Sequence, residues 1–166
     1  MLVKKLEYIF IFVVMISTGF LASNYYDTYM FENNELSDEY KVRIYTKEQE
    51  ILQNMNQNFG FSVKFPLIVT DRFKGRLYGL TSYENGEIKI YLNKKVMQES
   101  MDYMVESVIA HEYAHALLFQ LFQQGYIHEE DGGHSKLWKD TCKKLGGQEC
   151  RQYVNQEEII MSKMPF

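Results

Sequence analysis

The sequence is poor in proline and cysteine, and both shortages limit what the chain can be. Only two prolines occur, Pro66 and Pro165, so nothing interrupts the helical and strand patterns between them. The two cysteines, Cys142 and Cys150, are too few for a zinc ribbon, which needs four ligands in paired spacing. They are close enough in sequence to form a disulfide in an exported domain, and burial of Cys142 as an apolar residue is the alternative.

The chain also lacks any concentration of positive charge. It has 18 Lys and Arg against 22 Asp and Glu, with the basic residues scattered along the sequence. Because nucleic-acid binding usually requires a basic face, we expect no direct nucleic-acid partner. The 13 tyrosines and 11 phenylalanines indicate a packed core, and 166 residues provide room for one domain with such a core.

An uncharged apolar run lies near the N-terminus. Lys4 and Lys5 precede the run Tyr8–Ala22. The run is short for a membrane-spanning helix, which needs roughly twenty residues, and it fits a secretory signal apart from Leu21 near the cleavage site. We therefore expect residues 1–23 to be a signal peptide or a membrane anchor, and a buried helix is the third alternative. Both favoured readings place the rest of the chain outside the cytoplasmic membrane, and a cytoplasmic location is the runner-up.

The remaining sequence divides into a connecting segment and one domain. Residues 24–45 have no clear period and are expected to be a spacer. The domain is expected over residues 46–166, and helical spacing of apolar residues predicts its first helix over residues 47–58. The expected capping residues of this helix are Thr46 and Gln49 at its start and Gly60 at its end.

Strand patterns follow at residues 66–70, 77–83 and 87–92. Asn85-Gly86 separates the last two, and Asn-Gly is a strong signal for a tight hairpin turn. We therefore predict an α+β fold in which a small antiparallel or mixed three-stranded sheet packs on helices. The other predicted helices span residues 100–124 and 135–145.

The string His111-Glu112-Tyr113-Ala114-His115 carries the main chemical signal. Histidines four positions apart lie on one face of a helix and can bind the same ion, and zinc favours such nitrogen ligands. Glu112 can then act as general base towards a water that the zinc makes more acidic. Two solvated histidines on a surface helix are the alternative, but apolar flanks indicate a buried helix, where unsatisfied polar groups are costly.

A third zinc ligand is expected downstream, where only His128 and His134 occur. His134 is preferred because Gly132-Gly133 lets the backbone approach a metal closely. It also opens the last predicted helix, where Leu137 and Trp138 can pack against the zinc helix. His128 lies in an acidic loop, and the remaining alternative is a carboxylate from Glu129, Glu130 or Asp131.

These motifs resemble the SprT-like metallopeptidases, the family that includes Spartan. The resemblance rests on the string His111–His115, on Gly133-His134 and on Trp138 four positions further. Upstream, Arg76–Thr81 and Ile88–Asn93 are similar to the strands that precede the zinc helix in this family.

The resemblance covers residues 46–150 and implies a zincin-like fold, one zinc ion and peptide-bond hydrolysis. Ser135 departs from the glycine usual after the third histidine, and the loop before His134 is longer than expected in the family. The site residues that we predict are Glu112 as catalytic base and His111, His115 and His134 as metal ligands.

The substrate is expected to be a polypeptide. We expect an extended peptide to dock by strand addition on the second strand, and an ordinary hairpin strand is the alternative. A zinc-stabilised binding module without catalytic activity, and an intracellular protease for DNA-bound proteins, are the alternative functions. The residues expected to bind substrate are Gly79, Leu80 and Thr81.

Overall fold

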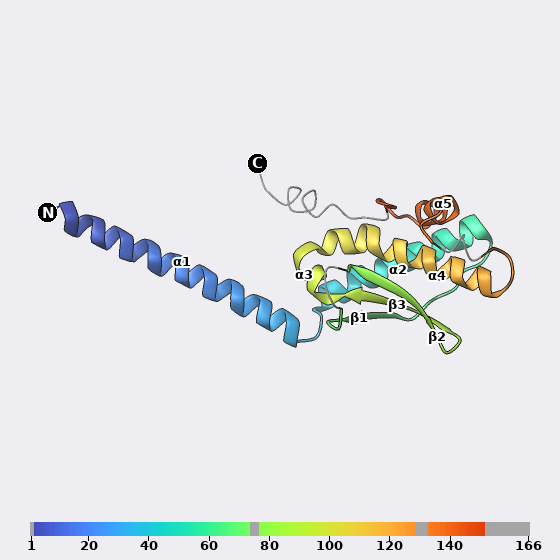
Figure 1. Ribbon diagram of the computed structural model, residues 1–166, viewed down its shortest axis with the longest axis horizontal. Coiled ribbons are helices and arrows are strands. Elements are labelled where there is room, and N and C mark those ends of the chain that lie inside the picture. The colour runs from blue at the N-terminus through green and yellow to red at the C-terminus, as the bar shows by residue number, and fades with distance from the viewer. Residues whose placement is uncertain (1, 74–76, 129–132, 152–166) are drawn as a thin grey trace. The chain divides into compact units, whose positions relative to one another are not determined.

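The computed structural model describes residues 2–73, 77–128 and 133–151 (Figure 1). The chain divides into two compact units, Met1–Leu36 and Ser37–Phe166. The first is a single helix, and the second combines helices with a three-stranded sheet. The predicted α+β class is therefore correct.

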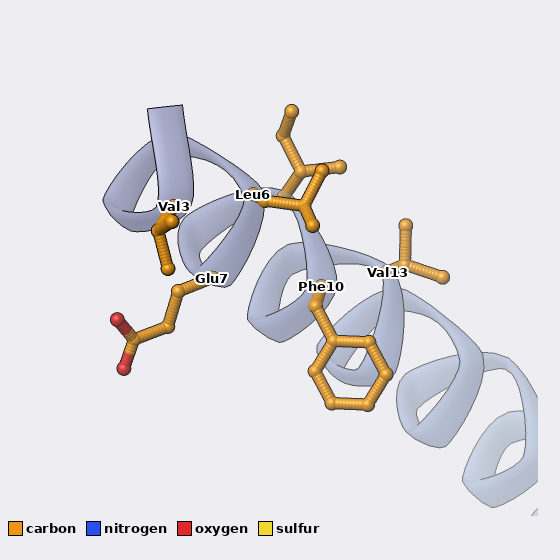
Figure 2. Close-up of a pocket in the computed structure, with 6 residues that line it drawn as sticks. Val3, Leu6, Glu7, Phe10 and Val13 are labelled. Carbon is orange, nitrogen blue, oxygen red and sulfur yellow. The ribbon is translucent and has the colours of Figure 1, made fainter. Parts of the chain in front are cut away.

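Helix α1 spans Leu2–Asn33 and includes the whole apolar run. It continues through residues 24–33, the first part of the expected spacer. Its apolar side chains project into the surroundings, as Figure 2 shows for the first turns. The segment Val3–Asn33 is long and apolar enough to cross a membrane, with a mean hydropathy of 1.9 in its most apolar window. None of that window is buried, which distinguishes α1 from the core helix of a soluble domain.

Helix α2 spans Asp38–Phe59 and begins earlier than predicted. The Ser37 hydroxyl accepts a hydrogen bond from the Tyr40 N–H at 3.4 Å, so Ser37 is the N-cap and the predicted capping box at Thr46 and Gln49 is wrong. The predicted end is correct, because Gly60 has a φ of 78° and its N–H donates to Asn56 O.

The sheet has the strand order β1-β3-β2. Strand β1 (Leu67–Thr70) pairs parallel with β3 (Glu87–Asn93), and β2 (Gly79–Glu84) pairs antiparallel with β3. Asn85 and Gly86 have φ angles of 53° and 85°, the left-handed conformations that the predicted hairpin turn requires. Arg76 of the expected strand motif lies outside the described residues.

The helix predicted over residues 100–124 is interrupted. It consists of α3 (Lys94–Tyr103), a π-helical turn η1 (Met104–Val108) and α4 (Ile109–Gln123). Ser100, at which the predicted helix was expected to begin, instead forms a kink inside α3, with φ −151° and ψ 61°. Helix α4 packs against β2 and β3 and also contacts α2 and α5 (Figure 1).

Helix α5 spans Lys136–Lys144, close to the predicted range. The Ser135 hydroxyl caps it by accepting a hydrogen bond from the Trp138 N–H at 3.1 Å. A disulfide joins Cys142 of α5 to Cys150. Gly147 lies inside this loop, where an added Cβ would be 2.8 Å from the Cys142 sulfur. The disulfide therefore needs glycine at this position for reasons of space.

Candidate metal centre

Three histidines from two parts of the fold converge on one point. His111 and His115 occupy successive turns of α4, and His134 lies just before α5. The His134 Nε2 atom is 3.2 Å from His111 Nε2 and 3.3 Å from His115 Nε2. Ligand nitrogens of all three residues lie within 4.8 Å of one another, an arrangement that could hold a metal ion.

The spacing of these nitrogens fits a zinc ion. Nitrogens about 2.0–2.1 Å from a tetrahedral ion are about 3.3 Å from one another, close to the observed separations. A single proton on His134 Nε2 could be donated to only one of its two neighbours, whereas a cation satisfies all three nitrogens. Three histidine ligands also leave the fourth position of a tetrahedral ion free, as catalytic zinc sites require.

The pKa values of two of these histidines are lowered, which favours the neutral form that a metal binds. Burial, reinforced by the charges on His115 and His134, lowers the pKa of His111 to about 3. Burial also lowers the pKa of His134. Since a metal binds neutral imidazole, both shifts mean that less proton release accompanies metal binding at neutral pH.

Trp138 forms one wall of the site. Its indole is stacked on His115 with centroids 5.2 Å apart, and it meets His111 and His134 edge-on at 4.6 Å each. The side chain is 1% exposed, and its Nε1 has no hydrogen-bond partner among the described residues. The indole therefore orients the three imidazoles by packing alone, and it leaves a buried donor unsatisfied.

We expect Trp138→Ala to lower the free energy of unfolding of the metal-free protein by about 3–5 kcal/mol, because it leaves a cavity. Trp138→Phe should cost much less. Phenylalanine retains an aromatic wall and removes the unsatisfied donor, which itself costs about 1–3 kcal/mol. Urea unfolding followed by circular dichroism measures both variants. Equal destabilisation by the two changes would show that the indole N–H has a partner after all.

Glu112 is buried beside the histidines and held by β2. It is 6% exposed, and the Thr81 hydroxyl lies 2.7 Å from its Oε2 and 2.9 Å from its main-chain oxygen. Gly79 faces the same side chain, and an added Cβ there would be 2.8 Å from Glu112 Cγ. Burial raises the pKa of Glu112 to about 7, although hydrogen bonds with Thr81 lower it. A carboxylate with this pKa is suited to exchanging protons near neutral pH.

A second buried carboxylate ties α4 to α2. Tyr113, which is fully buried, donates a hydrogen bond to Glu48 Oε1 at 2.7 Å, and Lys64 Nζ lies 2.6 Å from Glu48 Oε2. Burial and this carboxylate raise the pKa of the Tyr113 hydroxyl. The contact fixes the rotation of α4, and with it the direction of the neighbouring Glu112. No local pattern predicts this pair, because Glu48 is a polar residue on a helix predicted from its apolar positions.

The structure brings the predicted metal ligands and the predicted base together. His111, His115 and His134 converge, with Glu112 buried next to them. His128 is exposed and is not part of the histidine group found among the described residues. The alternative ligands Glu129, Glu130 and Asp131 lie outside those residues.

The three residues expected to bind substrate do not share one environment. The Thr81 and Gly79 positions face Glu112, whereas Leu80 is 46% exposed. This division follows from the alternation of side chains along a strand. The same alternation is a sequence signal that places Gly79 and Thr81 on one face of the strand and Leu80 on the other.

Comparison with known proteins gives one match. The model of the SprT-like family matches residues 47–158, which is more than half of the chain. No curated protein and no solved structure matches it.

Proposed function

Because the chain belongs to the SprT-like family, we propose that it is a zinc-dependent metalloendopeptidase with a zincin-like fold. The observation that carries the proposal is the convergence of three imidazole nitrogens, in which His134 Nε2 lies 3.2 and 3.3 Å from the other two, next to a buried glutamate. In this proposal the ligands of a single zinc ion are His111, His115 and His134, and the general base is Glu112.

A bound zinc ion supplies Lewis-acid chemistry, since it polarises a peptide carbonyl and makes a water more acidic. Glu112 takes a proton from the attacking water while the water oxygen bonds to the carbonyl carbon. Glu112 then delivers this proton to the amide nitrogen as the C–N bond breaks, which gives a carboxylic acid and an amine.

The edge of the sheet is the proposed docking place for the polypeptide. Strand β2 has β3 on one side, and no strand lies on its other side among the described residues. A peptide can add there as a further strand through main-chain hydrogen bonds, with alternate side chains directed to either face. We propose that the substrate pairs with the main chain of Gly79, Leu80 and Thr81, the part of β2 nearest Glu112.

The test is cleavage of an unfolded polypeptide such as reduced casein by the zinc-loaded protein. We expect mass spectrometry to find new internal termini, which disappear when a chelator removes the metal and return when zinc is restored. Intact casein after long incubation with zinc-loaded protein would contradict the proposal. That result would favour a zinc-stabilised binding module without catalytic activity.

We also propose that the enzyme domain acts outside the cytoplasmic membrane. Two independent features support this location. Helix α1 carries Lys4 and Lys5 before an exposed apolar run, an order that keeps the N-terminus inside. The Cys142–Cys150 disulfide is a type of bond that persists mainly in oxidising compartments.

A retained anchor fits α1 better than a cleaved signal. Tyr25, Tyr26 and Tyr29 follow the apolar run, Tyr8 opens it, and all four are more than half exposed. Tyrosines at both ends of an apolar helix are typical of membrane–water interfaces. The helix also continues without a break past Ala22, where cleavage was the alternative.

A reporter enzyme that is active only outside the cytoplasm, fused after Phe166, should show full activity. We expect the fusion to stay with the membrane fraction after alkaline washing, as an uncleaved anchor requires. Deletion of residues 2–23 should abolish reporter activity in intact cells. Full reporter activity from the deletion variant would show that export does not depend on α1, whereas no activity from the full-length fusion would place the domain inside the cell. The latter result would favour the intracellular protease for DNA-bound proteins.

A further inference from the structure

We propose that Thr81 is a positioning residue for the general base, and that Gly79 provides the space in which the base is held. The inference rests on the proposed function, because it assigns these two residues a role in the same reaction. It differs from the expectation that their side chains bind substrate.

The contacts of Thr81 are directed at one residue. Its hydroxyl lies 2.7 Å from Glu112 Oε2 and 2.9 Å from the main-chain oxygen of Glu112. The hydroxyl has one hydrogen to donate and lone pairs to accept with, so it can keep a hydrogen bond to Glu112 whether or not the carboxyl carries a proton. These two contacts of the Thr81 hydroxyl therefore hold the side chain of Glu112 close to its own turn of α4.

The position of Thr81 is fixed by the pairing of β2 with β3. Thr81 is paired with Ile90 of β3, the central strand, and Ile90 is fully buried. A catalytic group works when its support holds it within about 0.5 Å of the productive position. A long glutamate side chain has several rotamers, and a fixed hydroxyl on a neighbouring strand reduces that choice.

Gly79 makes room for the Glu112 side chain because it has no Cβ. A Cβ built at this position would be 2.8 Å from both Cγ and Oε1 of Glu112, and 3.0 Å from Cδ. Contacts below 3.0 Å force one of the groups to move. The requirement at Gly79 is therefore space for the carboxylate, and any side chain there would displace Glu112.

The two residues leave the edge of β2 to the substrate. Leu80 lies between them in sequence and is 46% exposed, while Gly79 and Thr81 face Glu112. A docking peptide would thus contact the main chain of β2 and the Leu80 side of the strand. Replacing Thr81 should consequently affect the chemical step rather than peptide binding.

The test compares Thr81→Val, Thr81→Ser and the control Thr70→Val, which makes the same change on β1, the strand on the other side of β3. Valine keeps the shape and removes the hydrogen bond, so kcat should fall about 10- to 100-fold with unchanged KM and zinc content, as for other supporting groups. Serine should restore most of kcat, and Thr70→Val should behave like the wild type. A rise in KM with unchanged kcat in Thr81→Val would overturn the inference in favour of a substrate contact.

Crystal structures of the zinc-loaded wild type, Thr81→Val and Gly79→Ala give a readout that does not need activity. We expect the Glu112 carboxylate to shift in both variants while the three histidines stay in place. An unmoved carboxylate in both variants overturns the inference even if the enzyme is active. If the wild type cleaves no polypeptide, the proposed function fails, and the displacement of Glu112 still decides whether Thr81 positions it.

Discussion

Replacement of Glu112 by Gln is expected to lower the rate of polypeptide cleavage by about 100- to 10,000-fold, the usual contribution of a general base. Zinc content should not change. Glutamine has nearly the same shape, so it fits beside Gly79 and can still form a hydrogen bond with Thr81. Its amide cannot accept a proton from water, and it is not one of the three converging ligands. The measurement pairs initial cleavage rates with zinc analysis of the same preparation.

The matched control is Glu87→Gln. Glu87 is an exposed glutamate at the start of β3 that pairs with Lys89 at 2.8 Å, and it is not part of the histidine group found among the described residues. This variant should cleave at the wild-type rate. Unaltered cleavage by Glu112→Gln would remove Glu112 from the mechanism. Loss of zinc together with activity would instead mean that Glu112 is itself a ligand.

The second large effect is expected at His134. Replacement by Ala should lower zinc affinity more than about 100-fold, because removal of groups that only support a ligand already costs 10- to 100-fold. Activity should disappear at zinc concentrations that saturate the wild type. Trp138 is the single tryptophan of the chain and contacts all three histidines, so quenching of its fluorescence by Co²⁺ reports metal binding directly.

His128→Ala is the control for this experiment, because His128 is the other downstream histidine in the sequence. We expect wild-type zinc affinity and activity from it. The opposite pattern, in which His128→Ala loses the metal and His134→Ala keeps it, would assign the third ligand to the acidic loop. Circular dichroism of the metal-free variants excludes unfolding as the cause of either loss.

Local sequence signals were sufficient for the parts of the fold that depend on neighbouring residues. The turn at Asn85-Gly86 and the helix end at Gly60 were predicted correctly, since both depend on backbone conformations that few residues adopt. The histidine spacing on α4 was sufficient for the pair His111 and His115. The choice of His134 as the third histidine rested on the glycines that precede it. Its convergence with His111 and His115 depends on the folded chain.

The errors arise where distant residues decide the structure. Helix α2 extends back to Asp38. Lys47 is 4% exposed, and its ammonium group contacts Glu50 at 2.9 Å, Gly146 O at 3.1 Å and Glu106 at 3.4 Å. Two of these partners are far away in sequence, so no local pattern marks Lys47 as an interior helix position. Buried charges of this kind are tolerated because they are paired.

The same limit applies to the interrupted helix and to the support of the base. The spacing of apolar residues hardly changes at the kink at Ser100 and at the π-helical turn η1, so it predicts neither of them. The hydrogen bond between Thr81 and Glu112 joins residues 31 positions apart. Sequence alone could place Thr81 on a strand, but the partner of its hydroxyl is set by how α4 packs on the sheet.

The most direct test of the metal centre is a crystal structure of the zinc-loaded protein, with data collected at the zinc absorption edge. We expect one anomalous peak about 2.1 Å from the Nε2 atoms of His111, His115 and His134. We also expect that no fourth protein side chain binds the ion and that the Glu112 carboxylate faces the open position. A peak bound by four protein ligands, or one that excludes His134, would contradict a hydrolytic zinc site.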